Sequence, residues 1–301
     1  MRAVIEAPFR SLDAWVSYLS HVELPVLRSS AHALEVLAAD QDTIDGRDIA
    51  AVVLQDPLLA TRVLSYIESH RNPARSAEIS TIGHAIMMLG IAPFFRSFAD
   101  PPVIEDRLAA HPRALLGLLK VVGRARHAAH WARDWAVQRR DLNADEVTVA
   151  ALLHDLAEML LWCVAPTLAL RIRSMQDADR ALRSRDAQRS VLGVAVLDLQ
   201  LALARAWNLP ELLLRLMDDE HAANPRVRNV ALAVSLARHA AGGWNDAALP
   251  DDYREIAALI GLPLDATLER IGVPEHARGA VLDADGGPAD NAAQSNRGDV
   301  R

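Results

Sequence analysis

The stretch LLHDLAEMLLW, residues 152–162, sets a His-Asp pair inside an apolar run. Apolar residues in and around it recur at spacings of three and four, which is the period of one face of an α-helix. That face is made by Val149, Leu152, Leu153, Leu156, Leu160 and Cys163. The spacing predicts a helix that is buried on its apolar side, and it leaves His154 and Asp155 as the polar residues to explain.

The rest of the chain shows the same helical period, and no alternation typical of strands persists. Ala and Leu are abundant, and both lose little side-chain entropy in a helix. Asp56 precedes Pro57, which predicts a helix capped by the aspartate with proline at its first position. The predicted fold class is therefore all-α, a multi-helix bundle of two helical lobes.

Prolines mark the boundary between the two lobes, because they cluster in ADPPVIEDRLAAHP, residues 99–112. We predict an N-terminal helical lobe over residues 1–99 and a second helical lobe over residues 100–277. The last residues, 278–301, are rich in Gly, Asp, Asn and Ala and contain few apolar residues. Such a composition cannot bury enough apolar surface to order a chain, so it predicts a disordered tail.

Composition excludes several classes of protein. The formal net charge is −7 and the chain has no dense Lys/Arg block, which argues against a nucleic-acid partner. The single cysteine, Cys163, excludes an intramolecular disulfide and a cysteine zinc knuckle, and its apolar surroundings predict a buried, inert thiol. No uncharged apolar run is long enough to span a bilayer, and the N-terminus lacks a signal-peptide core. We therefore expect a cytoplasmic protein without a membrane partner.

The His154-Asp155 pair suggests metal chemistry only if other helices supply further ligands, because neighbouring helical residues point about 100° apart. His127 in the preceding helical pattern and His221 in the DDEH stretch are the candidates. Four such ligands would suit a divalent metal, such as Mn or Fe, that activates water for phosphoester hydrolysis. The alternative is an incidental dipeptide whose histidine is satisfied by its neighbours. The chain contains no GxSxG, GxxxxGK[ST] or GxGxxG motif.

The order of motifs resembles the HDOD family, the HD-related output domains of bacterial signal transduction. The matching segments occur in sequence over roughly residues 24–239 and are ELP (23–25), QDPLLATRVL (55–64), ISTIGHAIMMLG (79–90), RHAAHWA (126–132), ALLHDLAEMLL (151–161) and ARAWNLPELL (204–213). The resemblance implies an all-helical protein whose second lobe is related to the metal-dependent HD phosphohydrolases.

The chain also departs from the pattern of the catalytic relatives. Val196 stands where a histidine is common, Gln200 stands where glycine is common, and Arg238 aligns near a distant metal-binding aspartate. His127, His154, Asp155 and His221 are then the remaining positions of the HD site. Valine supplies no lone pair and arginine repels a cation. The resemblance therefore implies no metal, no cofactor and no catalytic residue, with Asp155 as an interior polar anchor.

Three functions remain open from the sequence. The first is a non-catalytic signalling or scaffold protein that regulates partners, including cyclic-di-GMP enzymes or kinases, and self-association into a homo-oligomer stays open. The second is a metal-dependent HD phosphohydrolase acting on nucleotides or cyclic dinucleotides, and the third is a small-molecule sensor that uses the remnant pocket. Candidate contact surfaces are the groove between the lobes and Phe94, Phe95 and Phe98.

Overall fold

A computed structural model describes residues 4–71, 78–179 and 182–285 of the chain. These residues form helices joined by short connections, and no strand occurs among them beyond one isolated parallel bridge between Val26 and Val103. The predicted all-α fold class is confirmed. Two compact units are present, Met1–Val234 and Ser235–Arg301.

The first helices of the chain, up to the predicted lobe boundary, are α1 (Leu12–Leu19), α2 (Arg28–Ala38), α3 (Gly46–Val53), α4 (Pro57–His70), α5 (Ile82–Leu89) and α6 (Ile91–Phe98). Helices α2 to α6 pack on one another, with α3 against α2 and α5, and α4 against α5. The predicted boundary at residues 99 and 100 falls in the connection after α6, inside the first compact unit. The division into lobes at that point stays a prediction.

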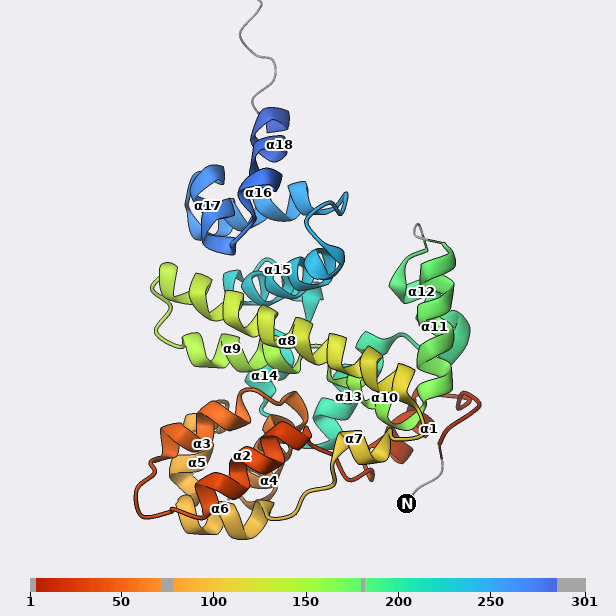
Figure 1. Ribbon diagram of the computed structural model, residues 1–301, viewed down its shortest axis with the longest axis vertical. Coiled ribbons are helices and arrows are strands. Elements are labelled where there is room, and N and C mark those ends of the chain that lie inside the picture. The colour runs from red at the N-terminus through yellow and green to blue at the C-terminus, as the bar shows by residue number, and fades with distance from the viewer. Residues whose placement is uncertain (1–3, 72–77, 180–181, 286–301) are drawn as a thin grey trace, which may run out of the picture. The chain divides into compact units, whose positions relative to one another are not determined.

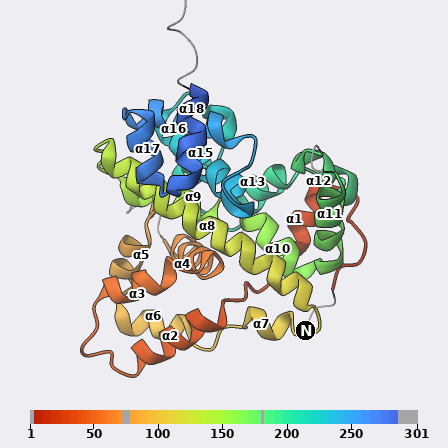
Figure 2. The same ribbon diagram turned by 45° about the horizontal axis from the view of Figure 1, so that its top comes forward.

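The second group of helices in this unit is built around one long helix. It contains α7 (Ile104–Arg107), α8 (Pro112–Gln138), α9 (Ala144–Leu153), α10 (Leu156–Val164), α11 (Pro166–Ala178), α12 (Ser184–Leu192), α13 (Val196–Ala206), α14 (Glu211–Leu216) and the 3₁₀ turn η1 (Asp219–His221). Helix α8 packs against α9, α10 and α11, and α13 packs against α10 (Figures 1 and 2). These helices carry the HD pair.

Helix α1 packs with this second group, although it lies within the predicted N-terminal lobe of residues 1–99. The indole of Trp15 on α1 donates to the carbonyl of Leu192, at 3.2 Å, and α1 lies against α13. The indole of Trp207 donates to the carbonyl of Ser20, at 3.3 Å. An apolar helix can bury its stripe against any complementary face, so sequence order does not decide its partner.

The second compact unit begins within α15 (Pro225–His239) and continues through η2 (Ala240–Gly242), α16 (Leu249–Ile260), α17 (Leu264–Ile271) and α18 (Glu275–Asp285). Helix α16 packs on α17, and α17 packs on α18. Within the unit, Nδ1 of His239 lies 2.6 Å from a carboxylate oxygen of Asp252. Residues 278–285 of the predicted tail are helical in α18, and residues 286–301 lie outside the described part of the chain.

One buried tryptophan, Trp162, shows how closely α10 approaches α8. Trp162 on α10 is 5% exposed. A Cβ atom built on Gly117 of α8 would meet its ring carbons at 2.6 Å. Only glycine fits at this contact. Cys163, the next residue, is also buried, and burial raises the pKa of its thiol to about 12, so the predicted inert thiol agrees with the structure.

The prediction that the FFRSF phenylalanines form a contact surface is wrong for two of them. Phe94 is fully buried and Phe98 is 5% exposed, and their rings lie 4.8 Å apart in the core beneath α6. Phe95 is half-buried. Instead, the exposed apolar side chains of this region are Met87 and Met88 on α5, which are 72% and 56% exposed.

Helices α9 and α10 together, Ala144–Val164, are apolar and long enough to cross a bilayer by length and composition alone. However, 89% of the 18-residue apolar window within this segment is buried inside the structure. A buried core helix of a soluble protein has the same composition. The fold therefore uses this segment as the centre of a helical core, with the HD pair at its midpoint.

Candidate functional site

His154 and Asp155 form the break between α9 and α10. Helix α9 ends at Leu153 and α10 begins at Leu156, so the pair lies between two helix termini that leave backbone groups without helical partners. The side chain of Gln200 on α13 satisfies two of them. Its Oε1 accepts from the N–H of Ala157 at 2.7 Å, and its Nε2 donates to the carbonyl of Leu153 at 2.8 Å.

Gln200 is 2% exposed, and it stands where the family pattern commonly has glycine. Because it bonds both sides of the break, it ties the end of α9 and the start of α10 to α13. The carboxylate of Asp155 makes no capping bond to α10 and faces His154 and Arg124. This departure from the family pattern therefore has a structural role that the sequence did not reveal.

The imidazole of His154 is held between two carboxylates. Its Nδ1 lies 3.3 Å from Oδ1 of Asp155, and its Nε2 lies 3.3 Å from Oδ1 of Asp219 in η1. The ring is 7% exposed. Burial is the largest influence and lowers the pKa of His154, but the hydrogen bonds and charges of the two carboxylates outweigh it and raise the pKa to about 9. The raised pKa favours the protonated ring, whose two nitrogens both face carboxylates.

A guanidinium faces the other side of Asp155. An Nη atom of Arg124 on α8 lies 2.9 Å from Oε2 of Glu158 and 3.6 Å from Oδ2 of Asp155. The Arg124 side chain is 17% exposed, and its Nε is buried without a partner. Burial acts to lower the pKa of Arg124, yet the charges and hydrogen bonds of Glu158 and Asp155 raise it. Arg124 therefore remains a cation in a mostly buried position.

These residues do not fit a divalent metal as they are arranged. A metal-binding histidine must be neutral and direct a lone pair at the ion, whereas both nitrogens of His154 face carboxylates. The carboxylate of Asp155 faces a guanidinium. Across the described ranges, no group of three or more His, Cys, Asp or Glu side chains is placed to hold a metal ion.

The structure brings together two of the four predicted positions, His154 and Asp155, and places the other two elsewhere. His127 is exposed, and its ring contacts that of Trp131 at 5.7 Å. The side chain of His221 is 72% exposed and bonds Asp218 at 3.0 Å. The remaining contacts of the site come from residues that the sequence analysis missed.

The missed residues lie close in sequence to the predicted ones. Arg124 precedes His127 by one helical turn, and Asp219 precedes His221 by two residues in DDEH. The run of acids in DDEH was a usable signal, because a buried imidazole needs a charged or polar partner. Of the two substituted positions, Val196 is half-buried at the start of α13, and Arg238 is exposed in the second compact unit. The guanidinium at the site belongs to Arg124.

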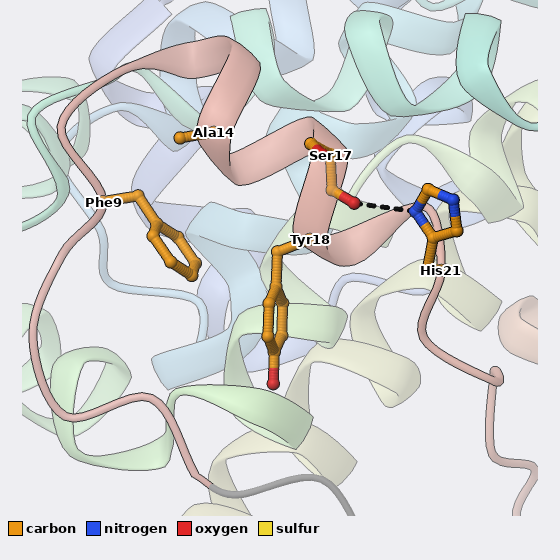
Figure 3. Close-up of a pocket in the computed structure, with 5 residues that line it drawn as sticks. All are labelled: Phe9, Ala14, Ser17, Tyr18 and His21. Atoms are coloured by element: carbon orange, nitrogen blue, oxygen red, sulfur yellow. Dashed lines mark hydrogen bonds between the residues drawn. The ribbon is translucent and has the colours of Figure 1, made fainter.

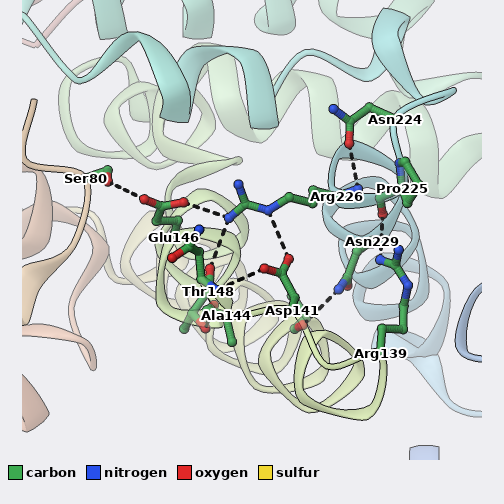
Figure 4. A network of polar contacts seen from close by, with 12 residues as sticks. Ser80, Arg139, Asp141, Ala144, Glu146, Thr148, Asn224, Pro225, Arg226 and Asn229 are labelled. Carbon is green, nitrogen blue, oxygen red and sulfur yellow. Dashed lines mark hydrogen bonds and ion pairs between the residues drawn. The ribbon is translucent and has the colours of Figure 1, made fainter.

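A second polar cluster joins the start of α15 to the start of α9 (Figure 4). The guanidinium of Arg226 donates to Asp141 at 2.9 Å, to Glu146 at 2.7 Å and to the carbonyl of Asn143 at 3.0 Å. Glu146 also accepts from the hydroxyl of Ser80 at 3.0 Å. Both carboxylates are paired within the protein, so the cluster joins these segments to one another.

A shallow surface hollow of about 550 Å³ lies beside α1 and is lined by Phe9, Ala14, Ser17, Tyr18 and His21 (Figure 3). The Nδ1 of His21 lies 2.8 Å from the carbonyl of Ser17, one helical turn earlier. The ring of Phe9 stands beside that of Tyr18, at 5.3 Å. The hollow does not include the HD pair, and its lining carries no carboxylate.

Comparison with known proteins agrees with this architecture. A crystal structure of the MmoQ response regulator from Methylococcus capsulatus str. Bath is similar, with a TM-score of 0.61 and 21% identity over 84% of this chain and 98% of that chain. A virulence factor from Campylobacter jejuni subsp. jejuni has a TM-score of 0.61 and 18% identity over 89% of this chain and 98% of that one. No curated protein sequence matches the chain.

The HDOD domain model matches residues 24–223, which is most of the chain. The protein therefore belongs to the HDOD family, as the order of its motifs predicted. The match ends shortly before the second compact unit begins at Ser235, and it includes the HD pair, Arg124 and Asp219.

Proposed function

We propose that this HDOD protein is non-catalytic and regulates partner proteins in a bacterial signalling pathway. The arrangement of Arg124 and His154 among the carboxylates of Asp155, Glu158 and Asp219 carries the proposal. HD-type hydrolysis needs a divalent metal that lowers the pKa of bound water or polarises the phosphate. A guanidinium supplies charge but no open coordination position, so it cannot take over that chemistry.

The burial of the site supports the same proposal. His154 is 7% exposed, and Gln200 forms hydrogen bonds with the backbone on both sides of the HD turn. A phosphoester substrate would have to reach carboxylates that are already engaged by cations of the chain. We therefore assign these residues a role in holding α8, the α9–α10 turn and η1 together.

Metal analysis and activity assays test the proposal directly. The purified full chain should contain no stoichiometric metal, and it should not hydrolyse a phosphodiester or a cyclic dinucleotide when Mn²⁺, Fe²⁺ or Ni²⁺ is added. The control variant is Asp145→Ala, because that carboxylate is 66% exposed and pairs with Arg133 on the surface. A bound metal together with turnover that Asp155→Ala abolishes and Asp145→Ala leaves intact would overturn the proposal.

The partner is proposed to be a cytoplasmic signalling protein, such as a cyclic-di-GMP enzyme or a kinase. The exposed methionines Met87 and Met88 support protein binding, because methionine side chains adapt to varied apolar surfaces. For a partner isolated from the native cell, replacing both with serine should weaken binding at least about tenfold, which corresponds to about 1.4 kcal/mol. Leu142→Ser is the control, since Leu142 is 98% exposed on a different segment. Equal effects of the two changes would exclude the methionine surface.

A further inference from the structure

We infer that the Arg124 guanidinium is the resident cation of the HD site and takes the structural place of a divalent metal. The inference deepens the proposed function, because it explains what holds the HD carboxylates once no metal does so. It concerns the stability of the site and needs no partner protein.

The geometry places one cation between two carboxylates of the same helix end. Asp155 and Glu158 are three residues apart at the start of α10, so their side chains lie on one face. An Nη atom of Arg124 lies 2.9 Å from Glu158 and 3.6 Å from Asp155. Without it, these two partly buried carboxylates, 14% and 31% exposed, would lose the cation that they share.

Arg124 also connects this helix end to a different helix. Because it lies near the middle of α8, its ion pairs join α8 to the α9–α10 turn, as a metal ion joins ligands from separate helices. On its other side, Asp155 contacts His154, which reaches Asp219 in η1. The chain of contacts thus runs from α8 through the HD turn to η1.

A neighbouring arginine of the same helix provides a matched comparison. Arg126 is two residues further along α8, and a rotation of about 100° per residue turns it to a different side of the helix. Its Nε donates to the carbonyl of Gln55 at 2.6 Å. A Gln substitution at 124 or 126 removes the same charge from the same helix, but only the substitution at 124 removes the guanidinium that pairs with Glu158 and Asp155.

A double-mutant cycle on the full chain tests the inference, with melting temperatures measured by calorimetry in buffer containing EDTA. Arg124→Gln should lower the melting temperature by about 3 °C or more, because it removes one partner of a partly buried ion pair and leaves the carboxylate charges uncompensated. Glu158→Gln should lower the melting temperature of the wild type but should not lower that of Arg124→Gln, since there it relieves repulsion. Arg126→Gln combined with Glu158→Gln should give additive changes.

Two outcomes would overturn the inference. One is additivity of Arg124→Gln and Glu158→Gln, and the other is a rise of several degrees in the wild-type melting temperature with 1 mM MnCl₂ alone. If Arg124→Gln does not fold, the same cycle is run with Arg124→Lys, which keeps the charge but loses the planar fork and should retain only part of the coupling. Additivity would refute the role of Arg124 without touching the proposed function, which depends on the hydrolysis assays.

Discussion

Two helix breaks of this protein place an aspartate at the start of a helix and use it in opposite ways. At the α3–α4 break, Asp56 caps α4 by accepting from the N–H groups of Leu58 and Leu59, at 3.0 and 3.2 Å. At the α9–α10 break, Asp155 caps nothing with its side chain, and Gln200 from α13 bonds the backbone instead.

The two aspartates differ in their partners: Asp56 bonds backbone N–H groups, whereas Asp155 pairs with charged side chains. Asp56 also accepts from the N–H of Leu27 at 2.7 Å, so it joins α4 to the start of α2, and the side chain of Ser30 on α2 bonds it as well. Burial raises its pKa, while these hydrogen bonds act in the opposite direction. Asp155 can pair with Arg124 and His154 because a residue distant in sequence has taken over the backbone contacts.

The largest expected loss of stability follows from removing the carboxylate of Asp56, which bonds backbone N–H groups. Asp56→Ala should lower the free energy of unfolding by about 3 kcal/mol or more, because it removes a helix cap and leaves buried N–H groups unpaired. Urea titration followed by circular dichroism measures the change. Asp45 caps α3 in an exposed position, so Asp45→Ala should cost only about 1 kcal/mol. If both variants lost the same free energy of unfolding, burial would not be the reason why the Asp56 cap contributes more.

Removing the Gln200 amide at the α9–α10 break should lower the free energy of unfolding almost as much. Gln200→Met keeps the volume of the side chain but leaves the N–H of Ala157 and the carbonyl of Leu153 without their bonds, which should cost about 2–4 kcal/mol. The same urea titrations apply. Gln138→Met, at the half-buried end of α8, should change stability by less than about 0.5 kcal/mol. A Gln200→Met protein as stable as the wild type would contradict the assigned role.

The approach of α10 to α8, which lets Arg124 reach Asp155, depends on Gly117. Gly117→Ala should cost about 1–3 kcal/mol, because the new methyl group would meet the ring of Trp162 at 2.6 Å. Gly123→Ala on the same helix meets nothing within 4 Å and should be neutral or stabilising, since alanine favours helices more than glycine. Thermal unfolding of both variants measures these changes. A Gly117→Ala variant as stable as the wild type would show that α8 and α10 can move apart without loss of stability.

The effect of His154 appears as a dependence of stability on pH. Its pKa rises from 6.5 to about 9 on folding, so its contribution to stability is fully present below pH 6.5 and is lost as the pH rises through 9. Unfolding free energies measured from pH 6 to pH 10 should therefore fall over that window. His154→Gln should flatten this part of the profile, and an equally steep fall in the variant would assign the pH dependence to other groups.

Local features of the fold could be predicted from the sequence because their causes lie within a few residues. The cap at Asp56 needs only the following N–H groups and Pro57. The apolar stripe of residues 149–163 predicted a buried segment, and all of its members are buried. The order of short motifs was also sufficient to identify the family.

The partners of the HD pair could not be predicted in the same way. Residues three apart lie on neighbouring parts of one helix surface, so the sequence does not decide which of them contacts a residue of another helix. That is why His127 and His221 were chosen when Arg124 and Asp219 make the contacts. The packing of α1 on α13 was missed for a related reason, because an amphipathic helix does not specify which apolar face covers it.

The sequence by itself determined the helices, their buried faces, the cap at Asp56 and membership of the HDOD family. Only the tertiary structure decided that Gln200 bonds the backbone of the HD turn and that Arg124 faces Asp155 and Glu158. Hydrogen bonds within one turn follow from neighbouring residues, whereas contacts between helices depend on how each helix is rotated and how closely it packs. At the HD turn, that packing brings a guanidinium from α8 and an amide from α13 to the same helix break.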